Sequence, residues 1–530
     1  MQSDYYYLKD NIKIEPLVWK WYLWPHLIPP TTAALNLVGR YFKIMESYLN
    51  DPELHKKSAH DPKLLGYPFM NIDPTYVDEV RQLFATTKSE CQSLISLNED
   101  IKKFDKLLQN IEHGMSLEPF YKNIPDSLRG CVELVYDLNN HPMIRFIEPF
   151  LYRKYYNTKF QSLNLSIIEK DYRPYAFSTP RLSNGSDLEL NVAFSDPLVD
   201  DLLLMRKIPR KKEDIINSLK LDTPQINKFN LYFTGAISKV FHDNNYRGDK
   251  IRVRYFGHAG VLLEIKDFSI LIDPVLSYHY PSPLKRFSFN DLPDTIDYII
   301  CTHGHDDHVM LETLIQLRHK IKHIIVPENN NGFLADPSLK LIFKHIGFKS
   351  ILTLRELETI LFANGEIVAL PFLGEHTDLN IQSKLSYLVR LRNKKFLFLA
   401  DSNNLDQKLY EHIADLFGQV DVIFVGMECV GASMAWLYGP LLTNPLKKEM
   451  NQSRRFKASD SEKATQIVKQ MKCKEAYIYA MGQEPWLSYF MAIDYHENSH
   501  QIVESHMFIK NCRYLNVKSE LLYAQREWFY

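Results

Sequence analysis

The stretch THGHDDH at residues 302–308 carries three histidines and two aspartates within six positions. Imidazole and carboxylate groups are side chains that bind zinc, iron and manganese in proteins. The run before it, IDYIIC at residues 296–301, is short and rich in β-branched residues, so it predicts a buried strand. The stretch would then form a loop at the carboxyl end of a strand, where open α/β sheets carry their chemistry.

Four of these side chains, His303, His305, Asp307 and His308, have the spacing expected of a loop that curls around two cations. Adjacent Asp307 and His308 would struggle to share a single ion with both of the other histidines. A polar surface turn is the alternative, but three histidines so close behind a buried strand favour a metal site. The H-x-H-x-D-H pattern resembles the signature of the metallo-β-lactamase superfamily.

The composition is typical of a globular protein with two domains. The chain has 530 residues, of which 45% are hydrophobic and 24% charged. A net charge of −1 argues against nucleic acid as a partner. No apolar run approaches the roughly 18 residues of a membrane span, and the N-terminus lacks the features of a signal peptide. Six cysteines without C-x-x-C spacing favour reduced thiols and a cytoplasmic location.

The first half of the chain contains no recognisable metal or phosphate motif. Apolar residues at helical spacing predict a helix over residues 32–48, and a second helical segment is expected over residues 74–104. Asparagine, aspartate and glycine cluster at residues 244–250, which indicates a domain boundary. We therefore expect a mixed α+β N-terminal domain at residues 1–245 and a catalytic domain at residues 246–530.

Short apolar runs in the second half predict strands, and several of them end in a polar side chain suited to a metal site. One run ends in Asp273, a candidate to orient a ligand histidine by hydrogen bonding. Another delivers Asp401. His258 lies in the turn GHAG, where a plain turn residue is the default and a pocket residue the alternative. This order of runs resembles the α/β fold of the metallo-β-lactamases, an αββα sandwich.

The sequence departs from the zinc hydrolases of that superfamily at two places. Glu375 and His376 stand side by side at the third ligand motif, and spacing alone does not choose between them. Where such hydrolases carry a last ligand histidine, this chain has Met481, whose thioether is a poor ligand for zinc or iron. With Glu375 as a ligand, the set contains three imidazoles and three carboxylates. Carboxylates stabilise higher oxidation states, which favours iron and redox chemistry over redox-inert zinc.

The chain also resembles, over essentially its full length, the diiron β-hydroxylases of non-ribosomal peptide synthesis, of the chloramphenicol-pathway type. The resemblance lies in short motifs of both halves: EPLV at 15–18, WY at 21–22, HLI at 26–28, VGR at 38–40, THGHDDH at 302–308 and GEH at 374–376.

That resemblance implies a centre of two iron ions joined by an oxo or hydroxo bridge. The residues implied as ligands of one iron are His303, His305 and Glu375. The residues implied for the other iron are Asp307 and His308, with Asp401 bridging the two ions. Glu375 and Asp401 would thus take part directly in catalysis, while Asp273 and His376 would support the ligands from behind.

The resemblance further implies hydroxylation of the β-carbon of an amino acid that is tethered as a thioester to a carrier domain. Dioxygen would supply the oxygen atom, and an external donor would supply two electrons, because the sequence shows no flavin, haem or iron–sulfur motif. The alternative is a dinuclear zinc or manganese hydrolase of esters, lactones or phosphodiesters; a silent assembly subunit is less favoured. The N-terminal domain could dock the carrier or form a homodimer.

Two basic clusters are candidates for docking an acidic carrier domain. One comprises Arg206, Lys207 and residues 210–212, and the other comprises residues 447–448 and 454–455. Plain solvated loops are the favoured alternative for both clusters.

Overall fold

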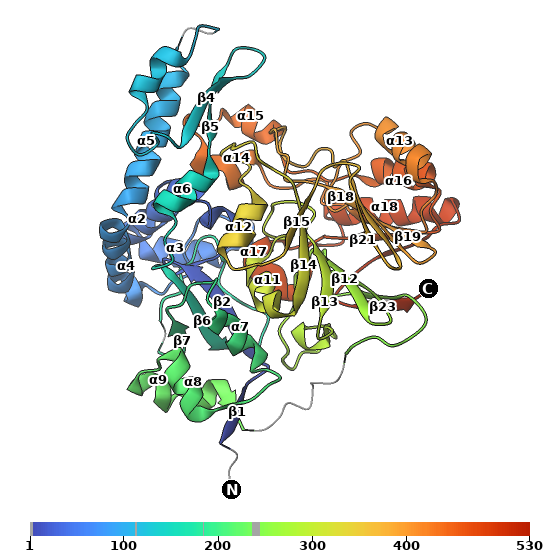
Figure 1. Ribbon diagram of the computed structural model, residues 1–530, viewed down its shortest axis with the longest axis horizontal. Helices are drawn as coiled ribbons and strands as arrows, with labels where there is room; N and C mark the ends of the chain where they lie inside the picture. The colour runs from blue at the N-terminus through green and yellow to red at the C-terminus, as the bar shows by residue number, and fades with distance from the viewer. Residues whose placement is uncertain (1–3, 112–113, 184, 236–243) are drawn as a thin grey trace.

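Two seven-stranded sheets form the centre of the catalytic half in the computed structural model, which describes residues 4–111, 114–183, 185–235 and 244–530 (Figure 1). The strands of the first sheet are, in spatial order, β15 (Ile351–Leu354), β14 (Ile321–Pro327), β13 (Ile296–Ile300), β12 (Phe268–Ile272), β11 (Val261–Ile265), β10 (Arg252–Tyr255) and β23 (Arg526–Phe529). The strands of the second are β16 (Thr359–Phe362), β17 (Gly365–Leu370), β18 (Ser386–Leu391), β19 (Lys394–Phe398), β20 (Val422–Gly426), β21 (Glu475–Tyr479) and β22 (Lys518–Leu521).

Each sheet is part parallel and part antiparallel. The strands β12 to β15 run parallel to one another, as do β19 to β22, while the remaining neighbours are antiparallel. Parallel strands are buried on both faces, which explains why β13, β14, β20 and β21 could be recognised as continuous apolar runs.

Apolar side chains fill the space between the two sheets. Val253 and Ile300 from the first sheet share this core with Val389, Phe398 and Phe424 from the second. The rings of Phe398 and Phe424 stack with centroids 4.8 Å apart. Face-to-face packing of two sheets, each with an outer helical layer, buries both faces of both sheets.

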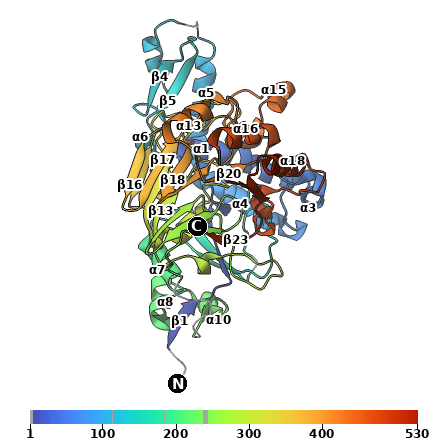
Figure 2. The same ribbon diagram turned by 90° about the vertical axis from the view of Figure 1, so that its right-hand side faces the viewer.

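The outer faces of the sandwich carry helices. The helices over the second sheet are α13 (Lys408–Phe417), α16 (Ser461–Met471) and α18 (His500–Tyr514). Those over the first sheet are α11 (Leu311–Leu317) and α12 (Leu339–His345). Figure 1 shows the sheets between these two layers, and Figure 2 views the molecule from the side on which α13, α16 and α18 lie. The predicted αββα sandwich is therefore confirmed.

The N-terminal half combines small sheets with helices and packs beside the α11 and α12 layer (Figure 1). Its strands are β1 (Tyr5–Leu8), β2 (Ile12–Val18), β3 (Trp21–Tyr22), β4 (Val132–Tyr136), β5 (Pro142–Phe146), β6 (Gln161–Ile167), β7 (Leu188–Leu190), β8 (Arg210–Lys211) and β9 (Phe233–Thr234). Its α-helices are α1 (Pro30–Asn36), α2 (Lys43–Asn50), α3 (Pro52–Ala59), α4 (Val77–Glu90), α5 (Gln92–Leu108), α6 (Glu148–Tyr155), α7 (Pro197–Leu204), α8 (Lys212–Leu219), α9 (Thr223–Asn227) and α10 (Phe229–Tyr232). The expected mixture of helices and strands is confirmed.

Both predicted N-terminal helices are interrupted. A π-helical turn, η2 (Leu37–Phe42), joins α1 to α2, so the first segment is helical throughout but changes its hydrogen bonding midway. The second segment is also helical, but it divides into two helices. Cys91 leaves the helical conformation, with φ −105° and ψ 26°, and separates α4 from α5. Its side chain is buried, so at this break the chain directs a short apolar side chain toward the core.

A network of buried charges joins the two halves of the chain. Glu15 on β2 is fully buried and accepts hydrogen bonds from Arg173 Nη2 at 2.6 Å and from Arg181 Nε at 3.1 Å. Arg173 Nη2 also lies 2.8 Å from Glu312 Oε2 on α11 of the catalytic half, and Tyr278 Oη donates to Glu312 Oε1 at 2.7 Å. The two halves are therefore held in register by paired charges as well as by apolar packing.

None of the described helices has both the length and the apolar character needed to cross a membrane.

Candidate metal centre

The candidate ligands come from loops at the carboxyl ends of several strands. Asp273 follows β12, and the loop 302–308 follows β13 in the first sheet. In the second sheet, Glu375 lies in the loop after β17, and Asp401 comes soon after β19. Because these loops meet at one edge of the sandwich, side chains up to 128 positions apart in the sequence, Asp273 and Asp401, become neighbours of the same site.

One group of potential ligands consists of His303, His305, Glu375 and His376, whose ligand atoms all lie within 4.8 Å of one another. His305 Nδ1 is 2.8 Å from Glu375 Oε1, and His376 Nδ1 is 2.7 Å from Glu375 Oε2. Burial would raise the pKa of Glu375, but His305 and His376 hold it at about 2, so the side chain is a carboxylate. Burial lowers the pKa of His376 to about 4 although Glu375 opposes this, so its imidazole is neutral.

A second group consists of His258, Asp307 and His308. His258 Nε2 lies 3.3 Å from Asp307 Oδ2, and His308 Nε2 lies 3.8 Å from the same oxygen. Burial would raise the pKa of Asp307, but His308 and His258 lower it well below its usual range. The three side chains therefore present one carboxylate and two imidazoles to a common point.

Asp401 stands between the two groups. Its Oδ2 atom is 3.2 Å from His308 Nε2 and 4.0 Å from His303 Nε2. These three residues also form a third set of potential ligands. One carboxylate between two clusters of imidazoles is the arrangement in which a bridging ligand joins two ions.

The donor atoms of these groups fit a pair of metal ions. Among the described residues, five buried polar atoms of these groups have no hydrogen-bond partner: His303 Nε2, His305 Nε2, Asp401 Oδ1, His258 Nδ1 and His376 Nε2. Buried polar atoms without partners are costly and rare unless an ion or a water satisfies them. Imidazole nitrogen and carboxylate oxygen are ligands that iron accepts, and no thiolate is present to select a softer ion.

Asp273 and Thr302 orient two of the histidines from behind. Asp273 Oδ2 lies 2.8 Å from His308 Nδ1, and Thr302 donates to Asp273 from its backbone nitrogen at 2.8 Å and from its hydroxyl at 2.6 Å. Because the Thr302 hydroxyl donates to Asp273, its oxygen is left to accept from His303 Nδ1 at 3.0 Å. Both histidines thus keep Nε2 free to face Asp401.

Substitution Asp273→Asn is expected to weaken metal binding by about 10- to 100-fold, the usual cost of losing a partner of a ligand histidine. The amide can present its nitrogen to His308, which then no longer donates from Nδ1. Iron affinity, measured by competition with a chelator, checks this expectation. Asp297→Asn is the matched control, because Asp297 on β13 accepts from Ser269 N at 2.9 Å away from the metal centre. Equal iron affinity in the two variants would contradict the role of Asp273.

Strained backbone accompanies the site. His258, Asp273, Glu375 and Ala400 all have positive φ angles, of 49°, 38°, 62° and 47°. Non-glycine residues adopt this region at a cost, and such residues cluster at functional sites. Each of these four residues lies in a turn that carries or directly precedes a residue of the site.

The structure places two residues that the sequence singled out, His258 and Met481. The sequence favoured a plain turn residue at His258, with a pocket residue as the alternative. In the structure its imidazole lies beside Asp307, which agrees with the pocket residue. Met481 packs into the core beneath α16 and α18, away from the ligand groups. His258 thus supplies an imidazole to a centre whose expected last histidine is missing. The only signal in the sequence was its place in a turn directly after a predicted strand.

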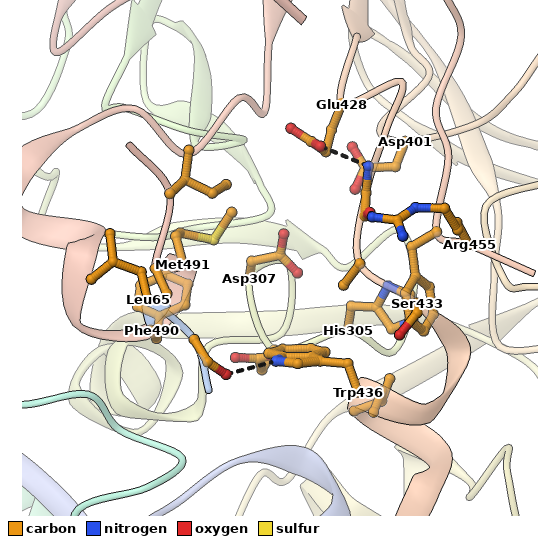
Figure 3. A pocket seen from close by; sticks show the side chains of 18 of the residues that line it. Leu65, His305, Asp307, Asp401, Glu428, Ser433, Trp436, Arg455, Phe490 and Met491 are labelled. Atoms are coloured by element: carbon orange, nitrogen blue, oxygen red, sulfur yellow. Dashed lines mark hydrogen bonds between the residues drawn. The ribbon is translucent and has the colours of Figure 1, made fainter. Parts of the chain in front are cut away.

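A cavity of about 650 Å³ opens beside the metal centre (Figure 3). His305, Asp307, Glu375 and Asp401 form its floor, and aromatic and apolar side chains line its walls. The wall residues come from α14 (Met434–Tyr438), from α17 (Ser488–Met491) and from residues 65–68 of the N-terminal half. Trp436 Nε1 donates to the backbone oxygen of Gly66 at 3.4 Å, so both halves of the chain shape this cavity.

A buried cluster of imidazoles and carboxylates on an αββα sandwich defines a binuclear metalloenzyme of the metallo-β-lactamase fold. Known proteins narrow this class further. The family model "Diiron non-heme beta-hydroxylase N-terminal domain" matches residues 7–236, and that of the β-lactamase superfamily domain matches residues 269–478. The curated protein 4-amino-L-phenylalanyl-[CmlP-peptidyl-carrier-protein] 3-hydroxylase of Streptomyces venezuelae is 35% identical over 528 residues, which cover 98% of this chain and 99% of that protein.

Solved structures agree with this match. The crystal structure of CmlA, a diiron β-hydroxylase from Streptomyces venezuelae, has a TM-score of 0.93 at 34% identity and covers 99% of both chains. A mutant of CmlA has a TM-score of 0.90, also at 34% identity, and covers 99% of this chain and 100% of its own. The present chain therefore belongs to the family of diiron β-hydroxylases and is an oxidoreductase with a diiron cofactor.

Proposed function

We propose that this chain hydroxylates the β-carbon of an amino acid held as a thioester on a peptidyl carrier domain. The observation that supports this most strongly is the full-length match to a hydroxylase whose name gives a carrier-bound amino acid as its substrate. In the overall reaction one C–H bond becomes C–OH. The second oxygen atom of O2 leaves as water, which requires two electrons and two protons from outside the substrate.

The ligand assignment is part of this proposal. His303, His305 and Glu375 would hold one iron, Asp307 and His308 the other, and Asp401 would bridge them, as their distances allow. His258 is a further candidate beside Asp307. His376 would support Glu375 and is close enough to bind in its place. When bound, the iron pair supplies the dioxygen chemistry that acid–base side chains cannot provide at an unactivated C–H bond.

The side chains around the cavity would exclude water and orient the acyl group. Trp436, Phe456, Phe490 and Met491 are aromatic and apolar members of the wall, and Figure 3 shows Trp436, Phe490 and Met491 around the space beside Asp307. Apolar walls with few polar groups are typical of small-molecule sites. Since residues 65–68 complete the wall, we propose that the predicted N-terminal domain closes the cavity over the substrate.

The two predicted basic clusters differ in how many of their charged side chains are already paired within the protein. In the first, Arg206 is buried and donates to Ile12 O, Lys207 pairs with Asp294 at 2.5 Å and Arg210 with Asp201 at 2.8 Å. Charges that are already paired inside the molecule attract a partner weakly. This cluster is therefore the weaker candidate for carrier docking.

The second cluster adjoins the cavity. Arg455 lines it, and Lys447 and Lys448 are exposed at the start of α15 (Lys448–Ser453). Asn451 on α15 accepts from Ala435 N at 2.9 Å, so α15 packs against the helix that forms a cavity wall. We propose that the carrier docks here and feeds its phosphopantetheine arm into the cavity.

The variant Lys447→Glu/Lys448→Glu is expected to raise KM for a loaded carrier by about 10-fold at low salt, because steering by surface charge depends on sign and is screened. The salt dependence of KM should flatten with it. Steady-state kinetics at several ionic strengths provide the measurement. Lys207→Glu/Lys211→Glu is the control and should leave KM and its salt dependence unchanged. The reverse pattern would move the docking site to the first cluster.

The electron donor is proposed to be a separate protein, and a homodimer stays a prediction. All six cysteines are unpaired, which supports a reducing compartment such as the cytoplasm. The hydrolase alternative has weak support, since a metal-dependent hydrolase of Sulfolobus acidocaldarius matches only 17% of this chain.

Elemental analysis of protein produced with iron, zinc and manganese all available tests the metal part of the proposal. We expect about two irons per chain, as in a diiron family, and a ferric absorption that bleaches on reduction. Two zincs, with no redox-active colour even after reconstitution with iron, would contradict it and support the hydrolase.

A further inference from the structure

Glu428 is a partly buried carboxylate on the wall of the cavity, in the loop that follows β20. Its Oε1 atom accepts two hydrogen bonds, from Gly431 N at 2.8 Å and from Gln501 Nε2 at 2.8 Å. Its Oε2 atom is buried and has no hydrogen-bond partner. One oxygen of the carboxylate therefore anchors the loop, and the other has no hydrogen-bond partner among the residues that the structure describes.

The free half of Glu428 lies near the metal centre. Figure 3 shows its carboxylate beside Asp401, with one oxygen bonded to the backbone and the other on the side of Asp307. Burial raises the pKa of Glu428, and the charges of Asp401 and Asp307 raise it further. An unpartnered carboxylate oxygen in the wall of a cavity is costly unless a donor or a cation satisfies it.

We propose that Glu428 binds the α-ammonium group of the aminoacyl substrate. This inference rests on the proposed function, in which the acyl group enters this cavity as a thioester. Once the carboxyl carbon is in thioester linkage, the α-ammonium is the charge common to every aminoacyl group. A carboxylate with one free oxygen is the complementary group.

The position of Glu428 suits the chemistry of that substrate. The α-nitrogen and the β-carbon are both bonded to the α-carbon, so their separation is fixed. When the ammonium group is bound, the β-carbon can therefore occupy only a small region around it. With the ammonium group on Glu428, this region lies beside Asp401 and Asp307 in the cavity. The same contact discriminates against acyl groups that lack an amine, because they would leave a buried carboxylate unpaired.

If Glu428 served only to hold the loop in place, only its Oε1 atom, which accepts the hydrogen bonds, would be needed. Glu428→Gln keeps the size of the side chain and an oxygen that accepts from Gly431 N, so the loop anchor survives while the charge is lost. Glu504→Gln is the matched control, since it also removes one carboxylate charge; Glu504 lies on α18, where it accepts from Ser461 N at 2.9 Å and does not line the cavity.

The experiment compares two loaded carriers on the wild type and on both variants. One carrier bears 4-amino-L-phenylalanine, the acyl group named for the Streptomyces relative, and the other bears 3-(4-aminophenyl)propanoate, which lacks only the α-amine. Dissociation constants, kcat/KM and iron content are measured for each protein. We expect the wild type to favour the aminoacyl carrier and Glu428→Gln to lose about 10- to 100-fold with that carrier, the value of a hydrogen bond to a charged group. The rate with the des-amino carrier should stay within a few-fold, and Glu504→Gln should keep the wild-type preference.

Three results would overturn the inference: equal losses with both carriers, an unchanged preference, or loss of iron from Glu428→Gln. The last would place Glu428 in the metal centre. A wild type that hydroxylates neither carrier would count against the proposed function itself, and is thereby told apart from a failure of the ammonium site.

Discussion

Glu375→Ala is expected to lose at least one of the two irons and to abolish hydroxylation. Glu375 is buried, ionised and within 2.8 Å of both His305 and His376, so its removal leaves two imidazoles without the carboxylate that completes their group. Fewer carboxylates would also disfavour the higher oxidation states of iron. Iron content and single-turnover product yield are the two measurements.

A matched control separates this effect from general damage. Glu366→Ala removes a carboxylate from β17, the strand that leads to the same loop, where Glu366 pairs with Arg390 at the surface. That variant should keep both irons and full activity. Unchanged hydroxylation by Glu375→Ala would refute the ligand assignment and shift attention to His376.

Arg173→Met is expected to lower the free energy of unfolding by about 3–5 kcal/mol, the usual cost of removing one partner of a buried ion pair. Arg173 contacts both Glu15 and Glu312, so its loss leaves two buried carboxylates short of a partner at the junction of the two halves. The methionine fills most of the volume, which keeps the packing loss small. Urea denaturation, followed by circular dichroism, measures the change.

Arg390→Met is the control for this prediction. Arg390 lies in a partly exposed pair with Glu366, and such pairs contribute about 0–1 kcal/mol. A loss in Arg173→Met no larger than in Arg390→Met would mean that the buried network does not hold the halves together. Because both halves line the cavity, Arg173→Met should also reduce activity even where the protein stays folded.

Much of the catalytic fold could be predicted from the sequence because its strands are short, apolar and followed by polar loops. Asp273 and Asp401 were found in this way, since each comes at the end of such a run. The loop 302–308 was found because its ligands are local, all within six residues. Local patterns of this kind can be recognised without knowing the tertiary structure.

The parts that escaped prediction depend on contacts between distant segments. His258 meets Asp307 across 49 positions, and a single histidine in a turn carries no pattern that reveals its partner. Residues 65–68 reach the cavity only through the packing of the two halves. The helix break at Cys91 likewise places a buried side chain in a tertiary core. The boundary at residues 245 and 246 stays a prediction, since one apolar core runs through both halves.

The most direct test of the central claim is a single turnover under ¹⁸O2. The chemically reduced diiron protein is mixed with an aminoacyl-loaded carrier, and the acyl group is analysed by mass spectrometry while still on its arm. We predict that the acyl group gains one ¹⁸O atom at its β-carbon, that it stays on the carrier, and that zinc-loaded protein gives no such product. An acyl group of unchanged mass, released as free amino acid whichever metal is bound, would contradict the account and identify a thioester hydrolase.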